Sequence, residues 1–164
     1  MSNPLIDFTF RDTGKSVKIR KVSPMLAVDV EATIPKPKPP VNKVDYGNGP
    51  VDEPNYADPG YDQAVKARSN LVGAAVLRAT ILRGVVVEGE EWRQEVAEYR
   101  QFVKDMTGEE LTEPSDLVVY VMRICVGTTD DMNELMAAIS TRSQPTAEAV
   151  ERSKASFPGA LPGA

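Results

Sequence analysis

This 164-residue sequence predicts a mainly α (α+β) fold, in which an N-terminal β-hairpin packs on a small helical bundle of about five to six helices. Three observations support this prediction. Apolar and polar residues alternate in two short segments near the N-terminus, and apolar residues recur at helical spacing in several later segments. Six of the thirteen prolines fall between residues 35 and 58, which predicts a proline-rich inserted loop. We expect residues 1–157 to form one domain and residues 158–164 to be a flexible tail.

The hairpin is predicted over residues 6–22. Residues 5–10 and 16–22 alternate between apolar and polar side chains, as half-buried strands do. Between them lies Arg11-Asp12-Thr13-Gly14-Lys15, in which the glycine supplies the backbone freedom of a short turn. A two-stranded hairpin is marginally stable alone, so we expect it to pack on helices.

The first two helices are predicted from their start signals. Ser23-Pro24 pairs a capping hydroxyl with a proline suited to the first helical position, and a short helix should follow through Thr33. Asp58-Pro59 repeats the signal, and a helix is expected from Pro59 to Arg83, ended by Gly84. Its second half is apolar on nearly all sides, which is typical of the central helix of a bundle.

Further helices are predicted towards the C-terminus. Residues 90–106 carry one apolar stripe opposite a row of acids. Residues 117–126 are ambiguous, because their β-branched content suggests a strand, whereas the flanking signals favour a buried helix. Residues 128–131 cap the next helix, and a last one is expected from Pro145 to about Phe157.

The insertion at residues 35–58 cannot be a helix, because proline removes backbone donors and disfavours helical backbone before it. Long structureless connections tend to be functional or disordered. Its Lys-Pro alternation is typical of a stiff spacer. Tyr46, Tyr56 and Tyr61 fall in or just after the insertion. They are either anchors for a partner or staples that hold the insertion on the domain, and the sequence does not decide between these interpretations.

Charge and cysteine content narrow the function classes. The net charge of −5 argues against a nucleic-acid partner. Residues 1–43 hold eight bases against four acids, and residues 88–116 hold ten acids against three bases, a polarity that can steer association or simply solvate helix faces. The single cysteine, Cys125, lies in an apolar context and is predicted to be buried and unreactive. We expect neither a signal peptide nor a membrane span, and a cytoplasmic location.

The residues needed for most catalytic and metal chemistry are missing. Histidine is absent, which removes the commonest general base and metal ligand. We therefore expect no enzyme, no cofactor and no metal site, although a hydrolase that uses carboxylates alone is not excluded by composition. Gly47-Asn48-Gly49 is predicted to be a turn, since no phosphate-loop pattern completes it.

The remaining candidates are partner-binding residues. One helix stripe at i, i+3, i+4, i+7 spacing fits a buried core better than an exposed partner groove, and both interpretations stay open. The candidates are this stripe and the apolar residues of the insertion: Val41, Val44, Tyr46, Tyr56, Met132, Leu135, Met136 and Ile139.

The order of these segments resembles a known family. Phe8-Thr9-Phe10 precedes the run from Val17 to Leu26, and the insertion bears Val44 to Gly49 and Glu53 to Pro59. Further along, Arg78 to Val85 reads Arg-Ala-Thr-Ile-Leu-Arg-Gly-Val, and Arg123 to Leu135 opens with Arg-Ile-Cys-Val-Gly-Thr-Thr-Asp. Together these segments resemble the tail assembly chaperones of long-tailed bacteriophages and related prophages. The resemblance covers nearly the whole chain, and its motifs are structural, with no catalytic signature.

The resemblance implies a largely helical protein of the host cytoplasm that is absent from the finished virion. Such chaperones bind the long, helix-rich tape measure protein, keep it soluble and help to recruit tail tube subunits. Self-association is a further option. The alternative is a structural virion subunit, such as a head–tail completion or minor tail protein, which also presents loops and hairpins to its neighbours.

Overall fold

The computed structural model describes residues 4–144, and its N-terminal part is a small antiparallel sheet. Strands β1 (Ile6–Thr9) and β2 (Ser16–Ile19) form the predicted hairpin, with Phe8 opposite Val17. Its turn contains Gly14 at φ 67°, a conformation that favours glycine. A third, two-residue strand, β5 (Val85–Val86), pairs with the other edge of β2, so the strand order is β1-β2-β5.

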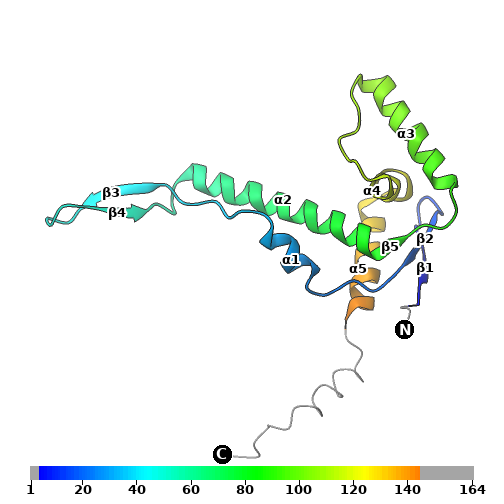
Figure 1. Ribbon diagram of the computed structural model, residues 1–164, viewed down its shortest axis with the longest axis horizontal. Helices are drawn as coiled ribbons and strands as arrows, with labels where there is room; N and C mark the ends of the chain where they lie inside the picture. Colours follow the sequence, from blue (N-terminus) through cyan, green and yellow to red (C-terminus); the bar gives the residue numbers. More distant parts are fainter. Residues whose placement is uncertain (1–3, 145–164) are drawn as a thin grey trace, which may run out of the picture.

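Helices make up most of the remaining structure, so the predicted mainly helical α+β class is confirmed (Figure 1). Residues 117–125 of the ambiguous segment are helical rather than a strand. Part of the segment is a π-helix, which ends where Val126 N–H donates to the carbonyl of Val121 at 3.0 Å. The predicted helix at 145–157 and the tail at 158–164 lie outside the described residues. The helices are α1 (Leu26–Ala32), α2 (Pro59–Gly84), α3 (Glu91–Thr107), α4 (Asp116–Val119), the π-helix η1 (Tyr120–Cys125) and α5 (Thr129–Ser143).

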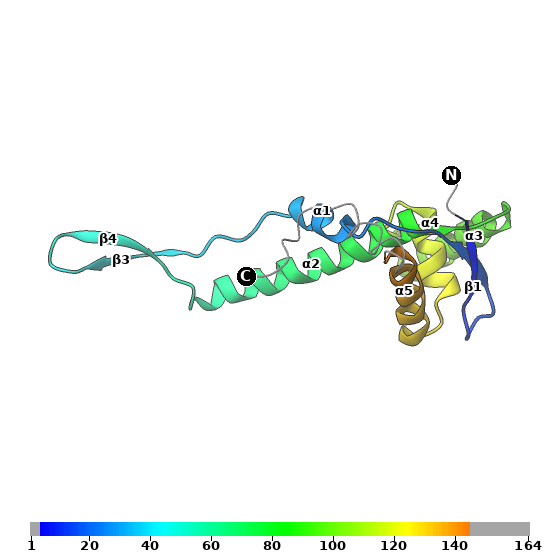
Figure 2. The same cartoon turned by 90° about the horizontal axis from the view of Figure 1, so that it is seen from below.

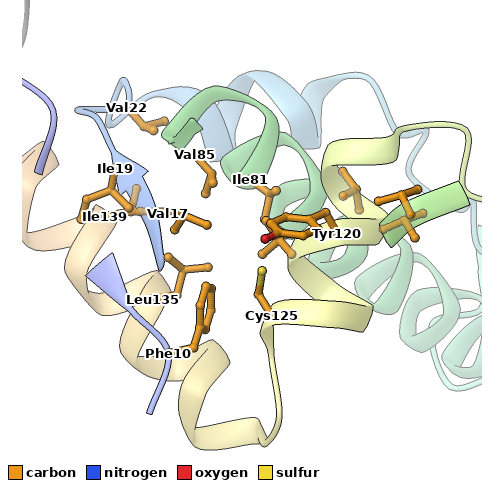
Figure 3. Close-up of a cluster of buried hydrophobic side chains, with 14 residues drawn as sticks. Phe10, Val17, Ile19, Val22, Ile81, Val85, Tyr120, Cys125, Leu135 and Ile139 are labelled. Atoms are coloured by element: carbon orange, nitrogen blue, oxygen red, sulfur yellow. The ribbon is translucent and has the colours of Figure 1, made fainter. Parts of the chain in front are cut away.

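The hydrophobic core lies where the sheet, the end of α2, the α4–η1 segment and α5 meet (Figure 3). Phe10, Ile81, Val121 and Leu135 are fully buried there. Gly84 lets α2 and α5 approach closely, since a Cβ at this position would lie 3.1 Å from two side-chain carbons of Ile139. The first hairpin therefore packs on helices, as a marginally stable hairpin must.

Helix α2 is not the centre of a bundle, and this expectation was wrong. Only Thr80, Ile81 and Gly84, all in its last turns, are buried. The rest of the helix extends away from the core and carries α1 along one side (Figure 1). The apolar residues of its second half are only partly covered, and they line a groove described below.

The proline-rich insertion is not helical, as predicted, but it contains two strands that the sequence analysis did not predict. Strands β3 (Val41–Asp45) and β4 (Pro50–Pro54) form a second hairpin, with Val44 opposite Val51. Gly47 and Gly49 have φ of 92° and 100° in its turn, where both N–H groups donate to Oδ1 of Asp45. This hairpin lies beyond the first residues of α2 and projects away from the core (Figure 2).

Candidate partner-binding surfaces

Large apolar side chains remain exposed on the parts of the chain that project from the core. Single exposed apolar residues are ordinary, but gathered ones mark binding surfaces. They lie on the β3–β4 hairpin, at the start of α1 and on it, along α2 and on the last turns of α3: Val41, Tyr46, Val51, Met25, Val28, Val65, Leu71, Phe102 and Met106.

The second hairpin exposes most of its candidate residues. Val41 and Tyr46 are 58% and 65% exposed, whereas Val44 is half-buried against its own hairpin. The Tyr46 hydroxyl donates to a carboxylate oxygen of Glu53 at 2.5 Å, and this hydrogen bond raises the pKa of the tyrosine. Tyr46 is thus oriented by its own hairpin while its ring stays available to a partner.

Tyr56 packs against the domain, as one of the two interpretations of the sequence predicted. Its ring packs edge-on against Tyr61 of α2, with centroids 5.8 Å apart, so it staples the base of the hairpin to the start of the helix. It nevertheless remains 67% exposed, and most of its surface is free to make other contacts.

Arg68 anchors the chain where it leaves α1 for the insertion. Its guanidinium donates to the carbonyls of Ile34 and Pro35, and to a Glu31 carboxylate oxygen at 3.1 Å. Because a guanidinium has five donors in a fixed plane, one side chain satisfies the end of α1 and the residues after it. The insertion therefore leaves the domain from a fixed point on α2.

The candidate stripe on α5 divides into core and surface. Leu135 and Ile139 are fully buried, so their assignment as partner-binding residues was wrong. The first hairpin and the end of α2 cover this face of the helix. Met132 and Met136 are only half-buried, and Met132 packs against the edge of the core.

An apolar groove of about 430 Å³ lies between the second half of α2 and the segment that leads through α4 into η1. The groove was not predicted from the sequence. The signal was present, since residues 71–82 are apolar on nearly all sides, but that pattern was interpreted as a central helix. The groove is lined mainly by apolar side chains: Leu71, Ala75, Leu77, Leu111, Val118 and Met122.

Charged residues flank this groove. Arg78 binds the Glu113 carboxylate at 3.0 Å, which fixes the 109–116 loop against α2. The Glu113 carboxyl is partly desolvated, which opposes ionisation, but the hydrogen bonds from Arg78 and Ser115 outweigh this and lower its pKa. Arg123 also lines the groove, and it makes no ion pair with any residue between 4 and 144. An acidic loop and one arginine therefore frame an apolar floor.

Part of the charge polarity seen in the sequence is neutralised within the chain. Lys15 binds Glu95 at 2.5 Å and Lys18 binds Glu88 at 2.9 Å, so the basic first hairpin pairs with the acidic segment around α3. These partly exposed ion pairs contribute little stability each.

The one thiol is unsuited to chemistry. Cys125 is fully buried, and burial raises its pKa to about 12, which leaves almost no thiolate near neutral pH. The prediction of a buried cysteine is confirmed. Burial likewise raises the pKa of its neighbour Tyr120, which packs against Trp92 with ring centroids 5.5 Å apart.

The surfaces described above are candidate binding surfaces of residues 4–144. In that range no three or more Cys, Asp or Glu side chains gather as metal ligands. None of the helices formed by those residues combines the length and the hydropathy that crossing a membrane requires. Comparisons of the chain with protein-family models, curated proteins and solved structures give no match.

Proposed function

We propose that this chain is a phage tail assembly chaperone of the host cytoplasm, without catalytic activity, that binds the tape measure protein. In this role it keeps the tape measure protein soluble, helps to recruit tail tube subunits and leaves before the virion is complete. The proposal rests on the family resemblance of the sequence together with the open apolar face of α2.

The groove along α2 is the observation that carries the proposal. A groove of about 430 Å³ with an apolar floor has room for a row of side chains from a partner helix. Tape measure proteins are long and helix-rich, and an amphipathic helix binds by laying its apolar face into such a groove. Met122 suits this role, because an unbranched thioether side chain adapts to differing partners.

The charges around the groove determine which charged residues a partner helix should carry beside its apolar stripe. Glu109, Glu110 and Glu113 belong to the loop on one side, and Lys104 and Arg78 neutralise two of them. Glu109 adds an unneutralised charge, so a partner with lysine or arginine beside its apolar stripe is favoured. Arg123 can form an ion pair with a carboxylate on the partner helix.

Co-expression with the tape measure protein encoded beside this chain tests the proposal. Ala74→Glu places a charge in the groove, at an exposed position of α2 where it should leave the fold intact. Ala64→Glu is the matched control, since Ala64 is exposed on the same helix but away from the groove. We expect the parent chain and Ala64→Glu to raise the soluble fraction of the tape measure protein and to co-purify with it. Ala74→Glu should do neither.

Two results would count against the proposal. One is a tape measure protein whose solubility does not change when the chain is present. The other is detection of the chain in purified particles by mass spectrometry, which would favour a structural virion subunit.

A further inference from the structure

The hydrogen-bond pattern of the β3–β4 hairpin leaves its two outer edges unequal. Asn55 N–H donates to the carbonyl of Pro40 at 2.7 Å, and the register pairs Val41 with Pro54. Hydrogen-bonded and non-hydrogen-bonded pairs alternate along an antiparallel ladder. The pairs Val41–Pro54, Lys43–Asp52 and Asp45–Pro50 are therefore the ones whose backbone groups point outward.

Only the β3 edge can accept another strand along its length. Val41, Lys43 and Asp45 each offer an outward N–H and carbonyl. On β4 two of the three outward positions are Pro50 and Pro54, which have no N–H to donate. Prolines at these positions block edge-to-edge pairing, as in other proteins that protect a sheet edge.

From this asymmetry we infer that two copies of the chain associate by antiparallel pairing of β3 with β3. The sequence Lys43-Val44-Asp45 is self-complementary in charge. With the two-fold axis at Val44, Lys43 of each copy lies opposite Asp45 of the other, and the two valines face each other. Opposite charges at facing positions stabilise a sheet, and like charges destabilise it.

The neighbouring registers of the β3–β3 pair are less favourable, because they place like charges opposite each other. Moving the axis to Lys43 places the two lysines directly opposite each other, which is unfavourable. Lys43 makes no ion pair with the described residues, and Asp45 uses Oδ1 for the turn, which leaves Oδ2 for the second copy. The charges therefore select the register centred on Val44.

Pairing of β3 with β3 also stabilises the β3–β4 hairpin. A two-stranded hairpin without a core is marginal in water, and β3–β4 lies away from the core (Figure 2). Pairing gives a four-stranded sheet in the order β4-β3-β3-β4. One face gathers Val44, Val51 and Tyr46 from both copies, since these residues share a face of each hairpin. Because Pro50 and Pro54 lie on both outer edges, the assembly closes as a dimer.

This inference goes beyond the proposed function and does not depend on it, because its test needs only the full-length chain. Sedimentation equilibrium over rising concentrations should show the mass approach twice that of the monomer. Lys43→Pro removes an outward N–H from β3 and should raise the dimer dissociation constant by at least about tenfold. Asp52→Pro is the matched control, because Asp52 faces Lys43 across the hairpin and its N–H points to the other edge. It should dimerise like the parent chain.

Cross-linking fixes the register. In Val44→Cys the new thiols of two copies face each other across a non-hydrogen-bonded pair, where Cα atoms about 4.5 Å apart allow a disulfide. Diamide, a mild oxidant that takes up the two electrons and two protons, should convert most of this variant to a covalent dimer. Val51→Cys carries its thiol on the same face but on the outer strand, and should stay monomeric on denaturing gels. Cys125 is buried and does not compete.

Three results would overturn the inference. The first is a parent chain that stays monomeric at all concentrations tested. The second is a dimer that survives Lys43→Pro, since it would use another surface such as the outer edge of β1. The third is equal cross-linking of Val44→Cys and Val51→Cys.

Discussion

The backbone N–H of Arg11 donates a hydrogen bond of 3.0 Å to Oδ1 of Asp131, although 120 residues separate them in the chain. The other carboxylate oxygen accepts from Gly127 N–H, also at 3.0 Å. One buried side chain thus joins the turn of the first hairpin, the residues after η1 and the first turn of α5.

We predict that Asp131→Asn makes the protein less stable near neutral pH and has less effect in acid. Burial opposes ionisation of Asp131, but hydrogen bonds from the backbone N–H groups of Gly127, Arg11, Asp12 and Thr128 outweigh it and lower its pKa. The folded pKa is therefore below the unfolded value of about 3.9. The stabilisation is fully present above that value and is lost as the pH falls through the folded pKa.

Urea unfolding at about pH 6 and about pH 3 measures this effect. The gap between the midpoints of the parent chain and Asp131→Asn should be wide at the higher pH and narrow at the lower one. Asp130→Asn, an exposed neighbour in the same helical turn, is the control. A gap of equal width at both pH values would contradict the prediction.

The two halves of the α5 stripe should differ in their contribution to stability. Leu135→Ala removes a fully buried side chain and should lower the free energy of unfolding by about 2–5 kcal/mol. Met136→Ala changes a half-buried side chain and should cost about 1 kcal/mol. Chemical denaturation of both variants checks this, and equal losses would mean that α5 is rotated from the orientation described.

Removing the second hairpin should leave the domain stable. Because Pro40 and Asn55 are hydrogen-bonded, an Asn-Gly turn can replace Val41–Pro54 and close the chain at the same place. The hairpin contributes no residue to the core, so we expect the melting temperature to stay close to that of the parent chain. Dimerisation should be lost.

Differential scanning calorimetry and sedimentation provide the two measurements. A melting temperature lower by more than about 5 °C, roughly 1.5 kcal/mol for a chain of about 150 residues, would show that the hairpin stabilises the core after all.

Cys125 should react slowly with iodoacetamide in the folded protein. With its pKa raised to about 12 by burial, the thiolate fraction near pH 8 is about a thousandfold below that of an ordinary cysteine. Mass spectrometry of the alkylated protein, with and without urea, gives both rates. Alkylation of the folded chain at the unfolded rate would show that the η1 segment opens readily.

Local patterns were sufficient to predict the elements whose stability is decided locally. Alternation over residues 5–22 with Gly14 gave the first hairpin, and Asp58-Pro59 gave the start of α2, where the Asp58 side chain accepts from Tyr61 N–H. The position of α2 was not predictable in this way. A helix apolar on nearly all sides fits both a bundle centre and an open groove, and only tertiary packing distinguishes them.

The number of prolines in the insertion did not indicate the second hairpin, because the effect of a proline on a strand depends on its position. Val41 and Val44, with Val51 across the turn, carried a strand signal, and Gly47-Asn48-Gly49 supplied the turn. Pro50 and Pro54 occupy places where no hairpin hydrogen bond requires their N–H, so they do not disrupt the ladder. Sequence patterns do not reveal which strand positions face outward until the register is known.

The length of α2 determines how far apart a dimer would hold its two grooves. The 26 residues of α2 span about 39 Å, so the core of each copy lies well away from its own β3. A symmetric pair joined at Val44 would hold its two grooves on the order of 80 Å apart, at opposite ends of a bivalent clamp. Under the proposed function, two weak contacts on successive stretches of one long helical partner would reinforce each other through avidity.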